Sequence, residues 1–240
     1  AGVINTAIYQ DPTLPIFNNS GEYAQSDLVN LENPVGLARG VFDESGTNRK
    51  FGNIFAEYAI LGNLKAKINL GSDRQTSRRD TYVGRNTLSG LQTGGRAVVQ
   101  TSENFNDLIE FTLNYEKQFN QNHRINAVGG YTYQVFSERG LTGGANNFIN
   151  DALLTNNLNA GDRTNFLLES FRSKNQLQSY LGRVNYALFD KYLVTASFRV
   201  DGSSRFGENN KYGYFPSFAL GWRLTEEDFI KNLNLFSDLK

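Results

Sequence analysis

A regular alternation of apolar and polar residues, arranged in paired stretches, most constrains what this chain can fold into. Every second residue from 192 to 200 is apolar, and the residues between them are mostly polar. The stretch from 180 to 188 follows the same rule, and only Phe189 and Asp190 separate the two stretches. A period of two is that of a β-strand with one apolar face, and a short break between two such stretches is typical of a hairpin. The pattern therefore predicts a β-hairpin.

The same unit recurs along the chain. Alternating stretches flank a break at Gly62 and Asn63 and another at 120–123. A fourth unit begins near Tyr214, and its return strand is expected near Leu233. We therefore expect about eight antiparallel strands of about 10 to 13 residues, longer than the usual globular strand of about 5 to 6.

The connections alternate between short and long. Those between hairpins extend over roughly 74–106, 137–175 and 202–212, and residues 1–50 resemble one more long loop. Short turns at one end and long loops at the other are typical of outer-membrane barrels, whereas long loops are uncommon in compact soluble domains. The fold class that we predict is all-β: an antiparallel transmembrane β-barrel segment with short periplasmic turns and long extracellular loops. The alternative is a soluble β-sandwich or solenoid with the aromatic residues in its core.

The two faces of the predicted strands differ in chemistry. Aromatic residues lie towards both ends of the apolar face, as expected for two girdles around an apolar band of about 25 Å; they include Tyr180, Tyr186, Tyr192, Phe198, Tyr214 and Trp222. The other face carries charges that belong in a wet lumen: Arg183, Arg199, Arg223, Glu110 and Glu116. Eight strands close only a small, filled barrel, so loops of this size favour part of a wider one. The first and last residues also favour a segment of a longer protein.

Composition excludes several kinds of site. The chain has no Cys and a single His, His123, which excludes disulfides, thiolate metal sites and paired-imidazole zinc sites. The net charge is zero, so there is no basic footprint for nucleic acid. Glycine pairs at 94–95 and 143–144 lack the Lys-Ser/Thr of a phosphate loop, and the Asp and Asn residues at 146–162 lack the spacing of an EF-hand. We expect no enzyme activity, no metal and no cofactor, and we expect His123 to be an ordinary surface residue.

The segment from 201 to 217 is the sharpest local feature. Asp201-Gly202 starts a turn, and Arg205 is placed to pair with Asp201 or Glu208. Pro216 lies within an alternating stretch, which indicates an edge strand, a bulge or a strand end.

This segment and its neighbours carry a family resemblance. Residues 180–186, 192–206 and 211–217 closely resemble the SusC/RagA family of TonB-linked outer-membrane transporters of Bacteroidetes. Weaker resemblance extends over most of the chain, through 11–17 with Gly21 and Asn33-Pro34, 109–115, 127–131 and 221–224.

The resemblance implies that residues 1–240 are part of one barrel domain of about 22 strands, with the plug and the TonB box outside this chain. It implies import of oligosaccharides or peptides across the outer membrane of a Bacteroidetes-like bacterium. The implied partners are a SusD-like surface lipoprotein, TonB, the glycan or peptide substrate, membrane lipid and lipopolysaccharide. An outer-membrane scaffold or secretion-associated protein without its own substrate is the alternative, and a soluble β-rich adhesin is a third.

Candidate ligand contacts lie in the longest predicted loop. Aromatic rings stack on apolar sugar faces, while amides and guanidinium groups bind hydroxyls or carboxylates. The candidates for contact with the ligand or with the partner are Asn146, Asn147, Phe148, Arg163 and Phe166. Packing within the loop is the alternative role for each.

Overall fold

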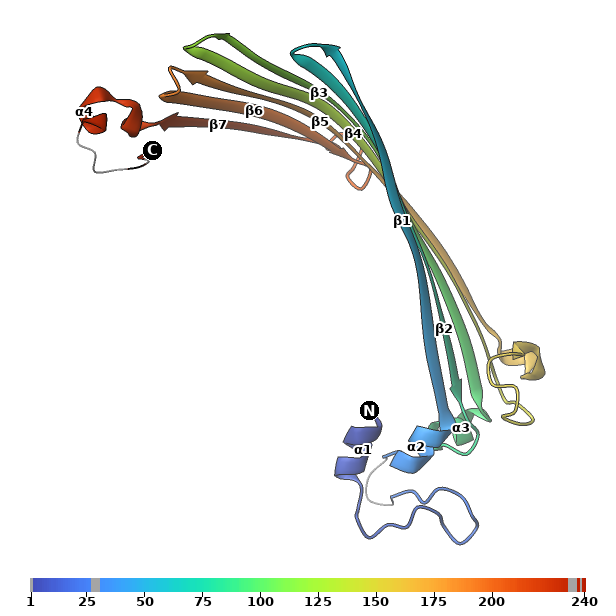
Figure 1. The fold of residues 1–240 in the computed structure, drawn as a ribbon. Coiled ribbons are helices and arrows are strands. Elements are labelled where there is room, and N and C mark those ends of the chain that lie inside the picture. The colour runs from blue at the N-terminus through green and yellow to red at the C-terminus, as the bar shows by residue number, and fades with distance from the viewer. Residues whose placement is uncertain (1, 27–30, 233–236, 238) are drawn as a thin grey trace. The chain divides into compact units, whose positions relative to one another are not determined.

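The computed structural model describes residues 2–26, 31–232, 237 and 239–240. Among them, seven strands lie side by side in one sheet in chain order (Figure 1). The strands are β1 (Val41–Leu61), β2 (Leu64–Val83), β3 (Arg96–Asn120), β4 (His123–Asn146), β5 (Leu167–Leu188), β6 (Tyr192–Ser203) and β7 (Tyr212–Trp222). The prediction of an all-β antiparallel fold is confirmed. The predicted return strand near Leu233 falls outside the described residues.

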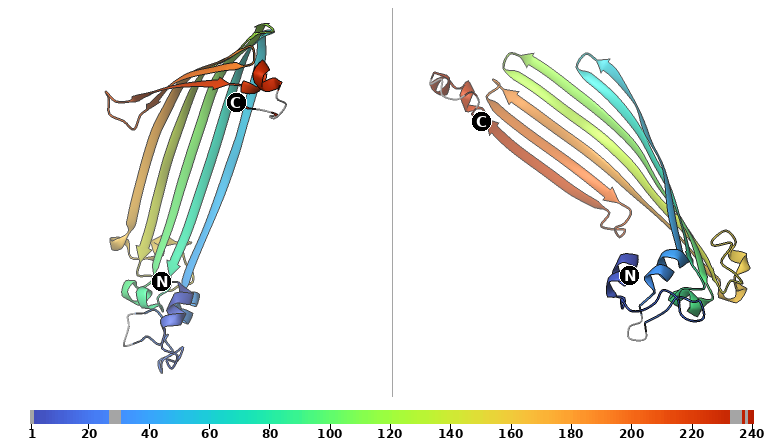
Figure 2. Two further views of the ribbon diagram at one scale, coloured as in Figure 1. Left: turned by 90° about the vertical axis from the view of Figure 1, so that its left-hand side faces the viewer. Right: turned by 60° about the horizontal axis from the view of Figure 1, so that its bottom comes forward.

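The helices are short. They are α1 (Val3–Tyr9), α2 (Pro34–Gly40), α3 (Leu88–Thr93) and α4 (Asp228–Lys231), with 3₁₀ turns at Leu158–Ala160 (η1), Arg163–Asn165 (η2) and Leu224–Glu226 (η3). In the part of the chain that the structure describes, no helix has the length and apolarity needed to cross a membrane. Figure 2 shows α1, α2 and α3 at one end of the strands, together with the connection from β4 to β5.

The chain divides into two compact units. Unit 1 comprises residues 1–49, 75–104 and 138–173, and unit 2 comprises residues 50–74, 105–137 and 174–240. The long connections that contain α2, α3 and η1 fall in unit 1, while the short turns between hairpin strands fall in unit 2.

The first five strands are 20 to 25 residues long, about twice the predicted length. The predicted loop boundaries were therefore wrong: residues 41–50, 74–83, 96–106, 137–146 and 167–175 are strand. The alternation fades there because polar residues occupy both faces. Cross-strand ion pairs take the place of apolar contacts, as between Arg79 of β2 and Asp43 of β1 at 2.6 Å. The three short turns lie where the sequence predicts them.

The register of the last three strands confirms the two faces. Tyr180 pairs with Val200, which pairs with Tyr214, so the alternating apolar residues of β5, β6 and β7 share one face. Arg183 pairs with Ser197 on the opposite face. We call these the apolar face and the polar face. Leu220 is 71% exposed on the apolar face, which is far from the burial of a soluble core.

Aromatic residues of the apolar face meet across neighbouring strands. Tyr192 at the start of β6 stacks on Trp222 at the end of β7, with ring centroids 6.2 Å apart. Further along the same two strands, Phe198 stacks on Tyr214 at 6.3 Å. This arrangement fits the expected aromatic girdles.

Pro216 lies inside β7, which is an edge of the sheet among the described residues. In the register of the sheet Pro216 is opposite Phe198 of β6. The loop before it differs from the expected pairing, because Asp201 pairs with Arg199 at 2.7 Å rather than with Arg205.

The two turns at the start of β4 and of β6 are tied together. The backbone N–H of Phe189 donates to the carbonyl of Asn122 at 2.7 Å, and Arg124 pairs with Asp190 at 2.7 Å. Phe189 and Asp190 have φ of 56° and 53°, the left-handed geometry of a tight hairpin turn. His123 lies 2.6 Å from the Tyr186 hydroxyl, so it is a half-buried part of this turn contact.

The carboxylate of Glu227, which follows β7 in the chain, links the start of β6 to the end of β7. Glu227 accepts hydrogen bonds from Lys191 Nζ at 3.1 Å, Tyr192 Oη at 3.0 Å and Trp222 Nε1 at 3.2 Å. The Lys191 hydrogen bond is the largest cause that lowers the pKa of Glu227 below its ordinary value. These hydrogen bonds hold the stacked rings of Tyr192 and Trp222 to the turn that follows β7.

Glu227 gives a pH-dependent prediction. Because its folded pKa is depressed, the stability it contributes is complete above the unfolded pKa of about 4.3 and is lost as the pH falls through the lower folded pKa. Guanidinium unfolding of the full-length protein between pH 7 and pH 3 should show a smaller acid loss for Glu227→Gln than for the wild type. Glu226→Gln is the control, because the Glu226 carboxylate forms an exposed ion pair with Lys231 at 3.3 Å. Identical pH profiles for wild type and Glu227→Gln would contradict this role.

Candidate ligand-binding site at the loop end of unit 1

A small apolar cluster holds the connection from β4 to β5 in place. Its buried members are Tyr82 at the end of β2, Ala97 in β3, Ala145 in β4 and Phe148 just after β4. The rings of Tyr82 and Phe148 meet edge to face, with centroids 5.6 Å apart and planes at 68°. The cluster therefore joins three strand ends to the start of the connection.

Polar contacts surround this cluster. The Tyr82 hydroxyl donates to Asp151 Oδ1 at 2.8 Å, and the backbone N–H of Arg85 donates to Asp151 Oδ2 at 3.2 Å. The Arg85 guanidinium donates to the carbonyl of Ile149. Burial, then the hydrogen bond to Asp151, raise the pKa of Tyr82 well above its ordinary value, so the hydroxyl stays a donor at neutral pH.

Two glycines let the connections approach each other. Gly94 and Gly95 have φ of 64° and 84°. A Cβ at Gly94 would lie 2.9 Å from the Cα of Asn147, so only glycine fits there. Asn147 N donates to Thr93 O at 2.8 Å, and Phe148 N donates to Gly94 O at 2.8 Å. This glycine pair, which lacks the signature of a phosphate loop, is a site of close backbone contact.

The N-terminal segment attaches to the same end of the strands. The Glu32 carboxylate accepts from the backbone N–H of Leu88 and from the Ser89 hydroxyl, at the first turn of α3. Asn33 accepts from Val35 N at 3.0 Å as the cap of α2, and its amide donates to Ala24 O at 2.9 Å. The Asn33-Pro34 motif therefore has a structural role that its sequence context did not reveal.

A hollow of about 420 Å³ opens beside this cluster, between the start of β3, the end of β4 and the start of β5. Its lining residues are Arg96, Ala97, Val98, Gly144, Ala145, Asn146, Thr164, Asn165, Phe166 and Leu167. The lining combines an aromatic ring, two amides, a hydroxyl and a guanidinium. That combination binds sugar or peptide groups by stacking and hydrogen bonding.

The structure brings two of the five predicted contact residues together. Asn146 and Phe166 both line the hollow, and Phe166 is 46% exposed. Arg163 lies in η2 and is exposed outside the lining, while Asn147 is exposed with a φ of 58°. Phe148 is 4% exposed within the cluster. Ligand contact by these residues stays a prediction.

Sequence reasoning missed three polar residues of the lining. Arg96 begins β3 immediately after the glycine pair, and Thr164 and Asn165 precede Phe166. The Asp162 side chain accepts from Thr164 N at 2.9 Å, which fixes the turn that presents Thr164 and Asn165. An Asp-x-Thr spacing is the one signal that predicts such a turn from sequence.

Comparisons with known proteins agree with this architecture. No family model matches the chain. TonB-dependent receptor P3 of Formosa agariphila is 33% identical over 239 residues, which cover 99% of the chain and 24% of that receptor. TonB-dependent receptor SusC of Bacteroides thetaiotaomicron is 29% identical over 261 residues, which cover 99% of the chain and 25% of SusC. The chain is homologous to SusC-like TonB-dependent receptors. It spans about a quarter of the length of these curated relatives.

Solved structures support the same fold. A structure of the RagAB peptide transporter matches with a TM-score of 0.80 and 21% identity, over 91% of this chain and 25% of that one. A structure of the RagAB peptide importer in an open state matches with a TM-score of 0.79 and 20% identity, over 96% and 24%. The resemblance to the SusC/RagA family and the location in the outer membrane are thus confirmed. These relatives are named as receptors or transporters, not as enzymes.

Proposed function

We propose that this chain forms part of the barrel of a TonB-dependent importer that takes up oligosaccharides or peptides across the outer membrane. The observation that carries the proposal is the similarity to SusC and to other TonB-dependent receptors along nearly the whole chain. The polar residues of one face, among them Arg183 and Arg199, line the lumen, while the apolar face meets lipid. We further propose that residues 1–240 belong to one barrel domain of about 22 strands.

The loop-end hollow is the proposed capture site. Phe166 supplies a stacking surface, while Asn146, Asn165 and Arg96 supply hydrogen-bond donors for hydroxyl, amide or carboxylate groups. Arg163 and Asn147 stay proposed contacts of the ligand or of a SusD-like lipoprotein, while for Phe148, which is 4% exposed, we propose the alternative role of packing within the connection. Both sugar and peptide chemistry suit this lining, so the proposal keeps both substrate classes. TonB would act through a part of the protein outside this chain.

A transport experiment tests the proposal. Cells of the source organism that lack the full-length gene should lose uptake of labelled neutral oligosaccharides or of labelled short peptides, and the wild-type gene should restore it. Phe166→Ala should lower uptake at sub-saturating substrate by about tenfold, the effect of losing ~1.4 kcal/mol of binding. Ile149→Ala is a matched control, because Ile149 is 85% exposed outside the hollow.

The contrary outcomes are distinct. Unchanged uptake of both substrate pools in the deletion strain would favour a scaffold without its own substrate. Normal uptake by the Phe166→Ala strain would show that the capture site lies outside the hollow. Co-purification of a surface lipoprotein with the tagged full-length protein tests the partner separately.

A further inference from the structure

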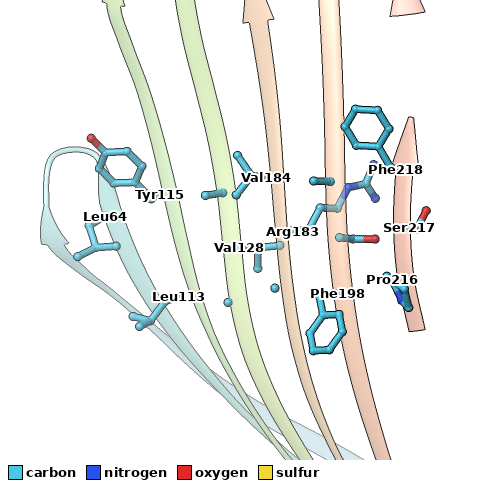
Figure 3. A pocket seen from close by; sticks show the side chains of 15 residues that line it. Leu64, Leu113, Tyr115, Val128, Arg183, Val184, Phe198, Pro216, Ser217 and Phe218 are labelled. Atoms are coloured by element: carbon cyan, nitrogen blue, oxygen red, sulfur yellow. The ribbon is translucent and has the colours of Figure 1, made fainter. Parts of the chain in front are cut away.

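An apolar groove crosses the apolar face of unit 2. It is an open depression of about 800 Å³ over β2 to β7. Figure 3 shows Leu64, Leu113 and Tyr115 on one side of it and Phe198, Pro216 and Phe218 on the other. Between these walls lie the branched side chain of Val184 and four small residues of the three middle strands: Ala127, Gly129, Gly182 and Ala196.

Two glycines of the floor leave open space in the groove. A Cβ added at Gly129 or Gly182 would meet nothing within 4 Å, and neither glycine has a positive φ. Backbone geometry therefore does not require glycine at these two positions. Their small size leaves an apolar channel open on a surface that faces hydrocarbon.

A second, polar hollow lies on the same strands, nearer their loop ends. It encloses about 220 Å³, and its lining residues are Tyr133, Gln176, Leu177, Gln178, Gly202, Ser203, Ser204, Lys211 and Tyr212. The Gln178 amide donates to the Tyr212 hydroxyl across it. A Cβ at Gly202 would lie 2.6 Å from the Tyr212 ring and 3.3 Å from Gln178 Cγ, so these groups share the apolar face.

The two hollows are arranged like the two parts of a lipid. On β5 the polar lining is at 176–178 and the groove lining at 182–184, and on β6 they are at 202–204 and 196–198. Six residues of a tilted strand advance roughly 15 Å along the membrane normal, about half of a hydrocarbon core of about 30 Å. Tyr131 and Tyr180, with ring centroids 5.0 Å apart, lie on these strands between the two levels. Tyrosines are enriched at the boundary between acyl chains and headgroups.

The lining of the polar hollow indicates the headgroup. Lys211 supplies a cation for a phosphate, and the amides and hydroxyls of Gln176, Gln178, Ser204 and Tyr212 suit sugar hydroxyls. We propose that the two hollows together bind one phosphorylated glycolipid of the outer leaflet, with an acyl chain in the groove and the sugar phosphate at Lys211. This site rests on the outer-membrane location and not on the proposed import function.

The test is native mass spectrometry of the full-length protein in detergent with added monophosphoryl lipid A or phosphatidylethanolamine. The wild type should retain one lipid A and little phosphatidylethanolamine. Gly182→Leu fills the groove and Lys211→Gln removes the cation, and each should lower lipid A retention by about tenfold. Ala66→Leu on the apolar face of β2 and Arg205→Gln in the Lys211 loop are the matched controls and should bind normally.

Three outcomes would overturn the site. Equal retention by the wild type and both variants would show that lipid A binds elsewhere. Equal retention of the two lipids would show that the polar hollow recognises no headgroup. A dimer that Gly182→Leu dissociates would assign the groove to a second copy of the chain. Heat-modifiable gel mobility confirms that each variant is folded, and Lys211→Gln changes a loop residue outside the strands.

Discussion

Replacing Phe148 by alanine is expected to lower the free energy of unfolding at the loop end of unit 1 by about 3 to 4 kcal/mol. Phe148 is 4% exposed and packs on Tyr82, so truncation removes buried apolar area and leaves a cavity beside Ala97 and Ala145. The connection at 147–166 should open with it. Hydrogen exchange in the full-length protein measures this opening directly, because the amides of Asn147 and Phe148 donate to the 93–95 segment.

The neighbouring residue provides the control for this experiment. Ile149→Ala should change stability by less than about 0.5 kcal/mol, because Ile149 is 85% exposed. Tyr82→Phe should lower the free energy of unfolding by an intermediate amount, about 1 to 2 kcal/mol, because it removes only the hydroxyl that is hydrogen-bonded to Asp151. Protection of the Asn147 amide that survives Phe148→Ala would show that the polar contacts alone hold the connection.

The candidate site was only partly predictable from the sequence. Asn146 and Phe166 were named for their chemistry, and they meet because the end of β4 lies beside the start of β5. Arg96 joins them from the start of β3 and Asn165 from η2, where no apolar alternation could place either residue. For Phe148 the sequence leaves ligand or partner contact and loop packing open, because its burial depends on Tyr82, an aromatic partner 66 positions earlier in the chain.

The fold was predictable where one face meets an apolar environment. The hairpin turns at 62–63 and 189–191 stand out because flanking alternation stops and resumes there. For the strands beyond the apolar band the sequence predicts loops, because residues such as Arg78, Arg79 and Asp80 give no period. Backbone hydrogen bonding continues through them, supported by ion pairs, and backbone pairing leaves no trace in composition.

Two adjacent substitutions in β2 test the assignment of the faces. Ile68→Arg is expected to destabilise the full-length protein in lipid vesicles by about 2 to 4 kcal/mol, because Ile68 is a 43% exposed residue of the apolar face. It lies four residues from the start of β2, roughly 10 to 13 Å along the membrane normal, near the centre of an apolar band of about 25 Å. A guanidinium at that depth loses its hydration without gaining an ionic partner.

Asn69→Arg provides the decisive comparison, because the next residue in a strand points to the opposite face. The Asn69 side chain accepts a hydrogen bond from Asn53 at 3.4 Å on the polar face, so an arginine there reaches a wet lumen. Its expected cost is below about 1 kcal/mol, since only one exposed hydrogen bond is lost. Denaturant unfolding in vesicles measures both values, and outer-membrane assembly in cells gives a second readout. If Asn69→Arg proved the more harmful change, the apolar face of β2 would line the interior, and the groove over Gly129 and Gly182 would hold a substrate instead of a lipid.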